Sequence, residues 1–275
     1  MFFRGAYGTV VLGQWKGEKC AVKVMEKEQG VGVSARRRKS LESELQALKL
    51  EHENIVKVHG VFAAEERYSV IIMEYVGSRN LHRLLIETPD KVLGRSWLLG
   101  VGRQISSALN HCHSRGVVHM DIKPANVLVT SSGVCKLGDF GCSVGVDSGD
   151  VPLDHSLVGT PGYQAPEFLR GGLPHPLCDV YSFGILLWQL DSREVPFQGQ
   201  HPQTIMFRCV SEDARPSTPT RHFINLPGFK KIYLSCWSSD VNDRPTACTI
   251  HSRLVSLLSS LSAPTSARSM TALRI

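Results

Sequence analysis

One stretch of the sequence, residues 119–126 (His-Met-Asp-Ile-Lys-Pro-Ala-Asn), places groups that can handle protons and cations close together. The carboxylate of Asp121 can accept a proton from a hydroxyl, and Asn126 can offer its amide oxygen to a hard cation. Thirteen residues after Asn126 stands Asp139-Phe140-Gly141, whose carboxylate can bridge Mg²⁺ to phosphate oxygens. The order and the intervals of these groups are too specific to be chance, and they indicate chemistry on phosphates.

Two further features near the start of the chain fit phosphate binding. Gly5-Ala6-Tyr7-Gly8, followed by Val10 on a predicted strand, lets backbone N–H groups approach phosphate oxygens, although taken alone it is better explained by an ordinary hairpin. Lys23 ends an apolar strand and can neutralise phosphate charge. Such a lysine needs an orienting partner, and Glu44 on the first amphipathic helix is the candidate. The alternative for Glu44 is a solvent-facing helix position.

The elements that must position these residues divide into two groups. Residues 1–35 and two later segments, Ile55–Phe62 and Tyr68–Glu74, have strand character, with a turn at Gly13–Gly17 and helical periodicity beginning near Ser40. After Gly77 the pattern is mainly helical, with two short strands. The predicted helices are Leu81–Glu87, Ser96–Arg115, Asp179–Leu190, Thr204–Val210, Phe229–Cys236 and Thr246–Leu261, and the strands are Val127–Thr130 and Val134–Leu137. A small β-rich lobe followed by a larger helical lobe is therefore expected, with a disordered tail from about Ser262.

Composition excludes several classes of protein. The 275 residues are 42% hydrophobic and 20% charged, which is typical of a folded globular chain. Part of the net charge of +6 lies in Arg36–Lys39, interpreted as a solvated helix face because no nucleic-acid motif accompanies it. No pair of the eight cysteines has C-x-x-C spacing, so the sequence does not predict a zinc cluster. It predicts reduced thiols, as in a cytoplasmic protein. The most apolar segment, Phe183–Leu190, is too short to span a membrane, and no secretory signal is found.

The whole set of motifs resembles the protein kinase signature, from the Gly-rich loop to Asp-Phe-Gly and Ala165-Pro166-Glu167. Asp179–Gly184 resembles the buried helix of the large lobe, and Arg244 resembles the family's partner for Glu167. The resemblance implies an α+β, bilobal protein kinase-like fold. It further implies one catalytic domain over residues 1–261, with the small lobe at about 1–76 and the large lobe at about 77–261.

The resemblance also implies a role for each matching residue, with ATP and Mg²⁺ as cofactors. Asp121 is expected to be the catalytic base, and Asn126 and Asp139 the Mg²⁺ ligands. Lys123, with Thr160, matches the serine/threonine-specific pattern rather than the tyrosine one, and a lysine there can neutralise charge on the transferring phosphoryl group. The residues expected to bind the nucleotide are Gly5, Gly8, Val10, Ala21, Lys23, Glu44, Met73 at the gatekeeper position, and Glu74 and Val76 in the hinge.

A narrower resemblance is to the Mos kinases of animal oocytes. It rests on methionine at position 120 in place of the usual arginine, on residues 134–143 (VCKLGDFGCS), and on Ile71–Glu74 and Leu81-His82. Mos proteins are serine/threonine kinases that act as MAP kinase kinase kinases in meiotic maturation and metaphase II arrest. The resemblance therefore implies a MAP kinase kinase as the protein substrate. Raf-like and mixed-lineage kinases are the nearest competitors.

A pseudokinase that docks partners without catalysis is the competing function. The residues that such proteins typically lose are all present here, which favours catalysis: Lys23, Glu44, Asp121, Asn126 and Asp139.

The sequence departs from the kinase pattern at two places. Because position 120 lacks the cation that an activation-loop phosphate pairs with, the enzyme is predicted to need no such phosphate, and alanine at Ser143, Ser148 and Ser156 should leave turnover nearly unchanged. Phe3 stands where the first loop glycine belongs, two residues from the start. The small lobe is therefore expected to be truncated at its first strand. Either the sequence is a fragment of a longer protein, which is the preferred interpretation, or the small lobe lacks an edge segment. In both cases weakened ATP binding is expected.

Overall fold

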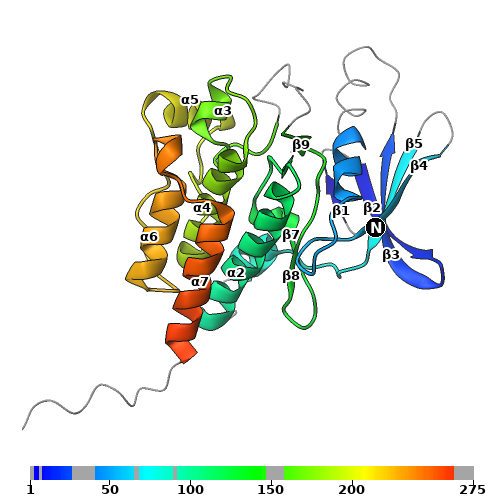
Figure 1. The fold of residues 1–275 in the computed structure, drawn as a ribbon, viewed down its shortest axis with the longest axis horizontal. Helices are drawn as coiled ribbons and strands as arrows, with labels where there is room; N and C mark the ends of the chain where they lie inside the picture. The colour runs from blue at the N-terminus through cyan, green and yellow to red at the C-terminus, as the bar shows by residue number, and fades with distance from the viewer. Residues whose placement is uncertain are drawn as a thin grey trace, which may run out of the picture.

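The fold has two lobes joined by a single hinge, a β-sheet lobe and a helical lobe (Figure 1). The computed structural model describes residues 3–5, 8–26, 41–64, 68–88, 92–146 and 158–262. The Arg36–Lys39 run, Ser148, Ser156 and the predicted tail after Ser262 lie outside these ranges. The α+β bilobal prediction is confirmed.

The small lobe is built on one antiparallel sheet with the strand order β1-β2-β3-β5-β4. The strands are β1 (Phe3–Gly5), β2 (Gly8–Trp15), β3 (Glu18–Glu26), β4 (Val58–Ala64) and β5 (Tyr68–Glu74). The predicted turn at Gly13–Gly17 begins too early, because β2 continues to Trp15 and only Lys16 and Gly17 turn, both with positive φ. Gly13 lies within the strand, paired with Cys20, and a side chain there would clash because a Cβ would lie 2.6 Å from a methyl group of Val22.

The edge strand β1 is short. Its three residues pair with Gly8, Thr9 and Val10 of the eight-residue β2, so most of β2 has no partner on that side among the described residues. The side chain of Phe3 lies outside the described part of the structure.

A helix at residues 41–47 packs on the small lobe beside the sheet (Figure 1). Ser43, Glu44 and Ala47 are buried, at the i, i+1 and i+4 spacing of one helix face. The predicted helix near Ser40 is therefore present from residue 41, and Glu44 lies on its inner face rather than toward solvent.

The large lobe is a bundle of helices around a buried central helix, α4. Its helices are the π-helix η1 (Arg83–Glu87), α2 (Arg95–His113), α3 (Pro166–Leu169), α4 (Pro176–Ser192), α5 (Pro202–Ser211), α6 (Pro227–Cys236) and α7 (Ala247–Ser262). Proline at the first position starts α3 through α6, because its fixed φ suits a helix start and its missing N–H would have no partner there. The side chains of α4 are buried almost throughout, so its apolar run is a core rather than an amphipathic surface.

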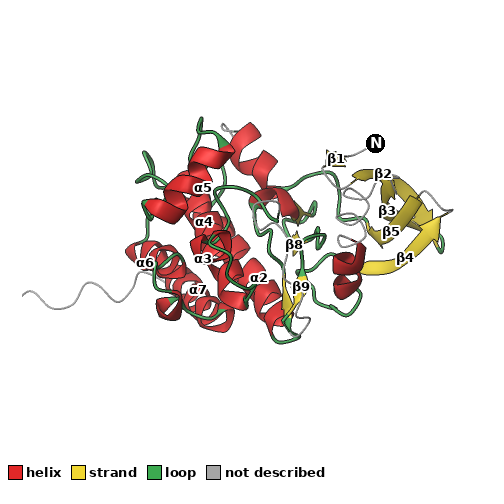
Figure 2. Ribbon diagram, turned by 90° about the horizontal axis from the view of Figure 1, so that it is seen from above, coloured by secondary structure: helices red, strands yellow, loops and turns green. Residues whose placement is uncertain are grey.

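Short strands flank the chemical motifs, and β8 and β9 among them lie between the two lobes in Figure 2. They are β6 (Val117–Val118), β7 (Val127–Val129), β8 (Cys135–Leu137) and β9 (Val144–Gly145), with the 3-10 turn η2 (Pro124–Asn126) directly before β7. A second 3-10 turn, η4 (Val241–Asp243), lies between α6 and α7 of the large lobe. β7 pairs with β8 and β6 with β9. The predicted strand Ile55–Phe62 starts only at Val58, because Ile55 instead bridges to Leu137 of β8. That bridge ties the small lobe to the catalytic strands.

Within the described ranges, no helix is both long and apolar enough to cross a membrane.

Candidate active site

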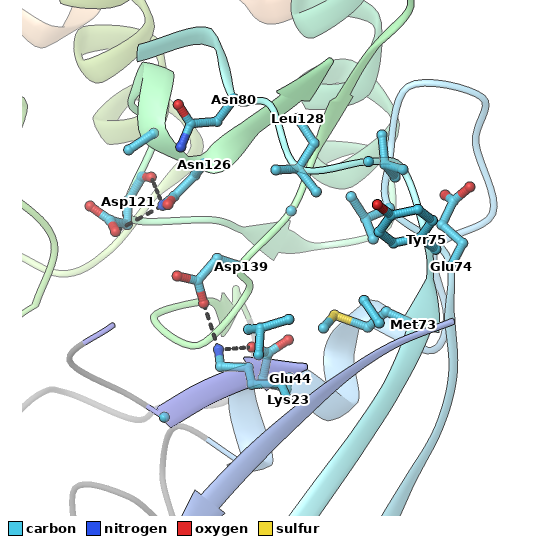
Figure 3. A pocket seen from close by; sticks show the side chains of 18 of the residues that line it. Lys23, Glu44, Met73, Glu74, Tyr75, Asn80, Asp121, Asn126, Leu128 and Asp139 are labelled. Carbon is cyan, nitrogen blue, oxygen red and sulfur yellow. Dashed lines mark hydrogen bonds and ion pairs between the residues drawn. The ribbon is translucent and has the colours of Figure 1, made fainter. Parts of the chain in front are cut away.

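A cavity of about 350 Å³ lies between the lobes and collects most of the predicted site residues (Figure 3). Of the residues expected to bind nucleotide, those lining it are Gly8, Val10, Ala21, Lys23, Glu44, Met73, Glu74 and Val76. Gly5 is not among the lining residues, and Thr160 lies just outside, next to the catalytic loop. The alternation of strand side chains explains the inner wall. Ala21 and Lys23 share one face of β3, and Val10 is paired directly with Lys23.

A chain of ion pairs lies on the small-lobe side of the cavity, which we call its roof and which is drawn in the lower part of Figure 3. The Nζ atom of Lys23 lies 2.6 Å from Oε1 of Glu44 and 2.7 Å from Oδ1 of Asp139 (Figure 3). Lys23 and Glu44 are 6% and 1% exposed, whereas the Asp139 side chain is only half-buried and opens into the cavity. The predicted partnership of Lys23 and Glu44 is present in the structure.

The electrostatics of this chain hold the lysine charged. Burial alone opposes charge on Lys23, but the carboxylates of Asp139 and Glu44 outweigh it and raise the pKa of the lysine. Burial raises the pKa of Glu44. Burial also opposes charge on Asp139, but the Lys23 ammonium outweighs it, so the pKa of Asp139 is lowered and its carboxylate is ionised at neutral pH. The roof therefore presents one cation and one ionised, cavity-facing carboxylate.

The large-lobe side of the cavity, which we call its floor, holds a second cluster around Asp121. Asp121 is 5% exposed. Lys123 Nζ lies 2.7 Å from Oδ2 of Asp121 and donates to the Thr160 hydroxyl at 2.6 Å. That hydroxyl in turn donates to Oδ1 of Asp121 at 2.7 Å, which closes a triangle. The side-chain nitrogen of Asn126 donates to the backbone oxygen and to Oδ2 of Asp121, at 2.8 and 2.9 Å.

The donor set of the cavity fits a hard divalent cation. Asn126 uses its nitrogen for both of those hydrogen bonds, so its amide oxygen is turned away from Asp121. Asp139 carries a second oxygen, Oδ2, besides the one that Lys23 holds. Carboxylate and amide oxygens are the ligands that Mg²⁺ prefers. Both residues line the same cavity (Figure 3).

The side of the cavity next to the hinge is apolar and suits a flat ring. Val10, Ala21, Met73 and Leu128 line it. The carboxylate of Glu74 is engaged by other protein groups. Its Oε1 accepts hydrogen bonds from the Lys57 backbone nitrogen at 2.7 Å and from Lys136 Nζ at 2.8 Å. The hinge therefore offers backbone groups rather than a free carboxylate to a ligand.

Asp179 of α4 holds the backbone of the catalytic loop by hydrogen bonds. The sequence did not reveal this role of Asp179. Asp179 is fully buried and accepts from the backbone nitrogens of His119 and Met120, both at 2.8 Å. The His119 ring accepts from Asp121 N and lies 3.1 Å from the oxygen of Gly138, with its ring centroid 4.7 Å from that of Phe140. A carboxylate near the start of a largely apolar helix was the available signal.

Other lining residues were also missed, because glycines and single apolar or amide side chains carry no chemical signal of their own. Those that the sequence analysis did not single out for the site are Val56, Gly77, Asn80, Ala125, Leu128 and Gly138.

The predicted pair of Arg244 and Glu167 is present in the large lobe. The guanidinium makes two parallel contacts to the carboxylate, at 2.6 and 2.9 Å, and Arg244 is 4% exposed. This bidentate pair fixes the segment 165–167 against the end of the large lobe.

Fold and cavity together define a protein kinase catalytic domain, and the family model of the protein kinase domain matches residues 4–254. The serine/threonine-protein kinase mos of Patiria pectinifera is 39% identical over 254 residues, covering 90% of this chain and 70% of that protein. The corresponding kinases of Xenopus laevis and Mus musculus are each 34% identical, covering 91% and 88% of this chain and 72% and 75% of theirs. The chain belongs to the Mos family of serine/threonine protein kinases. It is an ATP-dependent enzyme that uses a divalent metal.

Proposed function

We propose that this chain transfers the γ-phosphate of Mg-ATP to serine or threonine of a MAP kinase kinase, in the Mos role of oocyte meiotic maturation and metaphase II arrest. The proposed catalytic domain covers residues 1–261. The observation that carries the enzymatic part is the juxtaposition of two clusters across one cavity: Asp121 with Lys123 and Thr160 on the floor, and Lys23 with Glu44 and Asp139 on the roof.

Asp121 is the proposed base. Its carboxylate is held on one oxygen by Lys123 and on the other by Thr160, so its orientation toward an incoming hydroxyl is fixed before substrate binds. As the hydroxyl attacks, Asp121 accepts its proton. Lys123, whose Nζ lies 2.7 Å from Oδ2 of Asp121, faces the position where negative charge grows on the transferring group.

Lys23 is the proposed anchor for the α- and β-phosphates, and Glu44 holds it in place. Asn126 and Asp139 are the proposed ligands of Mg²⁺, which when bound neutralises phosphate charge. Val10, Ala21 and Met73 are proposed to enclose the adenine ring, with the hinge residues Glu74 and Val76 reading its edge through their backbone. Gly5 and Gly8 are proposed to let the loop between β1 and β2 approach the phosphates.

Transfer of labelled phosphate from Mg-ATP tests this proposal. The substrates are a kinase-inactive MAP kinase kinase and a generic protein such as casein, and the enzymes are the chain, Asp121→Asn and Asp213→Asn. Asp213 is a matched control because it lies far from the cavity and has φ +51, which asparagine tolerates well. We expect serine or threonine labelling of the MAP kinase kinase that Asp121→Asn lowers by at least about a thousandfold and Asp213→Asn does not change.

The outcomes separate the parts of the proposal. Labelling of casein without the MAP kinase kinase would keep the base and discard the pathway. Labelling that survives Asp121→Asn would overturn the assigned base. No transfer to any protein by the unmodified chain would favour the pseudokinase alternative.

A further inference from the structure

A buried hydrogen bond joins the start of the activation segment to the helix that carries Glu44. The hydroxyl of Ser143 donates to the backbone oxygen of Ser43 at 2.9 Å, although the two residues are 100 positions apart. Ser143 is 1% exposed and Ser43 is 7% exposed. Both groups are thus buried away from water. Because no water can replace the bond there, losing it would be costly.

This bond belongs to a closed circuit around the roof of the cavity. Ser43 directly precedes Glu44, which binds Lys23, and Lys23 binds Asp139. From Asp139 the chain runs four residues to Ser143, whose backbone nitrogen donates to Phe140 O at 2.9 Å and so closes a tight turn. The circuit therefore returns to the helix at residues 41–47 through Ser143.

The segment that carries Ser143 is fixed at its far end as well. β9 begins at the next residue and pairs with β6, where Val144 lies opposite Val118, directly before the catalytic loop. The Ser143 hydroxyl thus belongs to a segment paired with the large lobe, whereas its acceptor belongs to a helix of the small lobe. The contact therefore links the two lobes.

We propose that Ser143 is a positioning residue for catalysis: its hydroxyl holds the helix at residues 41–47 so that Glu44 keeps Lys23 in place beside Asp139. The inference rests on the proposed function of Lys23, Glu44 and Asp139 in binding nucleotide. Ser143 itself touches neither the cavity nor the reacting groups; it acts through Glu44.

The proposal revises one expectation from the sequence, which no observation yet tests. Ser143 was grouped with Ser148 and Ser156 as a residue whose replacement by alanine leaves turnover nearly unchanged. The hydroxyl of Ser143 is instead buried and engaged, so its loss is expected to reduce activity without any phosphate being involved.

A double-mutant cycle tests the proposal on the full chain. Ser143→Ala and Glu44→Gln are made singly and together, and kcat and KM for Mg-ATP are measured with a fixed protein substrate. Ser106→Ala is the matched control, because Ser106 is also fully buried and donates to a backbone oxygen, that of Arg103 at 2.9 Å, but within α2 and away from the cavity. Thermal unfolding is followed for all variants.

We expect Ser143→Ala to lower kcat/KM for Mg-ATP about three- to tenfold, the effect of losing one buried hydrogen bond. In the Glu44→Gln background the same change should have almost no effect, because the group it positions is already compromised. Ser106→Ala should lower the unfolding temperature similarly and leave kcat/KM unchanged in both backgrounds. Ser143→Cys, which keeps a weak donor, should fall between Ser143→Ala and the unmodified chain.

Two results would overturn the proposal: an unchanged kcat/KM in Ser143→Ala, or the same loss in both backgrounds. Either one leaves the proposed function intact, because that depends on the loss of transfer in Asp121→Asn. If instead Asp121→Asn keeps its activity while the Ser143 and Glu44 effects remain coupled, the assigned base fails and the positioning role stands.

Discussion

The carboxylate of Asp179 accepts a hydrogen bond from the backbone nitrogen of Met120 at 2.8 Å. Met120 has φ +64, in the left-handed region that a residue other than glycine occupies at a cost of about 1 kcal/mol. Asp179 is fully buried in α4 and also accepts from the backbone nitrogen of His119. The strained backbone just before Asp121 is therefore held by the carboxyl group of a residue in the core of the large lobe.

Replacing Asp179 by asparagine should damage catalysis more than stability alone explains. An amide offers only one acceptor oxygen, so its NH₂ group would face one of the two backbone N–H donors. We expect a loss of about 1.5–3 kcal/mol of stability and a fall in kcat of about tenfold or more, because the base is displaced. Kinetics of phosphate transfer together with chemical unfolding measure both.

Asp191→Asn is the control for that experiment. Asp191 lies in the same helix, is 2% exposed, and accepts from the backbone nitrogens of Ile224 and Asn225, far from the cavity. It should lose similar stability and keep its kcat. Equal effects of both variants on kcat would mean that Asp179 acts through stability only.

The contact between the catalytic loop and Gly159 predicts a second effect. A Cβ on Gly159 would lie 2.7 Å from the backbone oxygen of Met120, and the residue has φ +88. Gly159→Ala should therefore push the substrate-side segment away from Asp121 and lower kcat/KM for the protein substrate by about tenfold or more. Gly171→Ala is matched, because Gly171 has φ +95 but nothing within 4 Å of its Cβ position. A similar loss in both variants would contradict the steric explanation.

Much of the active site could be predicted from the sequence, because its residues stand in motifs at fixed intervals. The pairing of Lys23 with Glu44 and the pairing of Glu167 with Arg244 were both expected and are both present. The two-lobe fold followed from the change from strand to helix periodicity after residue 77. In each case the side chain itself carries the information.

The remaining features depend on backbone groups and on contacts between distant segments, which residue types do not encode. Ser143 binds a backbone oxygen 100 residues away, and Asp179 binds two backbone nitrogens. The strand predicted from Ile55 begins only at Val58, because Ile55 pairs with β8 instead. Local propensity favours a strand at residues 55–57, but the tertiary contact of Ile55 with β8 determines the backbone there instead.

The methionine at position 120 predicts independence from activation-loop phosphate. Met120 is 7% exposed and offers no cation for a phosphate to neutralise. Replacing Ser148 and Ser156 together by alanine should leave kcat within about twofold, the size of a neutral surface change. Phosphatase-treated enzyme should behave the same way, and a collapse of activity in either sample would refute the prediction. Met120→Arg should lower activity, because it places an unpaired cation in a buried position.

The ion pair of Glu167 and Arg244 predicts a dependence of stability on pH. Burial alone opposes charge on Glu167, but the Arg244 guanidinium outweighs it and lowers the pKa of the carboxyl below its ordinary value of 4.5. A carboxyl with a depressed pKa stabilises the fold above pH 4.5, and this contribution is lost as the pH falls through the lower, folded-state pKa. Glu167→Gln should therefore cost about 2–3 kcal/mol at pH 7, and the difference from the unmodified chain should shrink toward about pH 3.

Urea unfolding between pH 3 and pH 8 measures this difference directly. The matched control is Glu212→Gln, because Glu212 pairs with Arg208 at 3.0 Å on the surface of α5, where both side chains are exposed. Exposed pairs contribute little, so this variant should differ from the unmodified chain by less than about 0.5 kcal/mol at every pH. If Glu167→Gln showed a loss that did not vary with pH, the stabilisation would come from packing or neutral hydrogen bonds, and the charge on Glu167 would have no part in it.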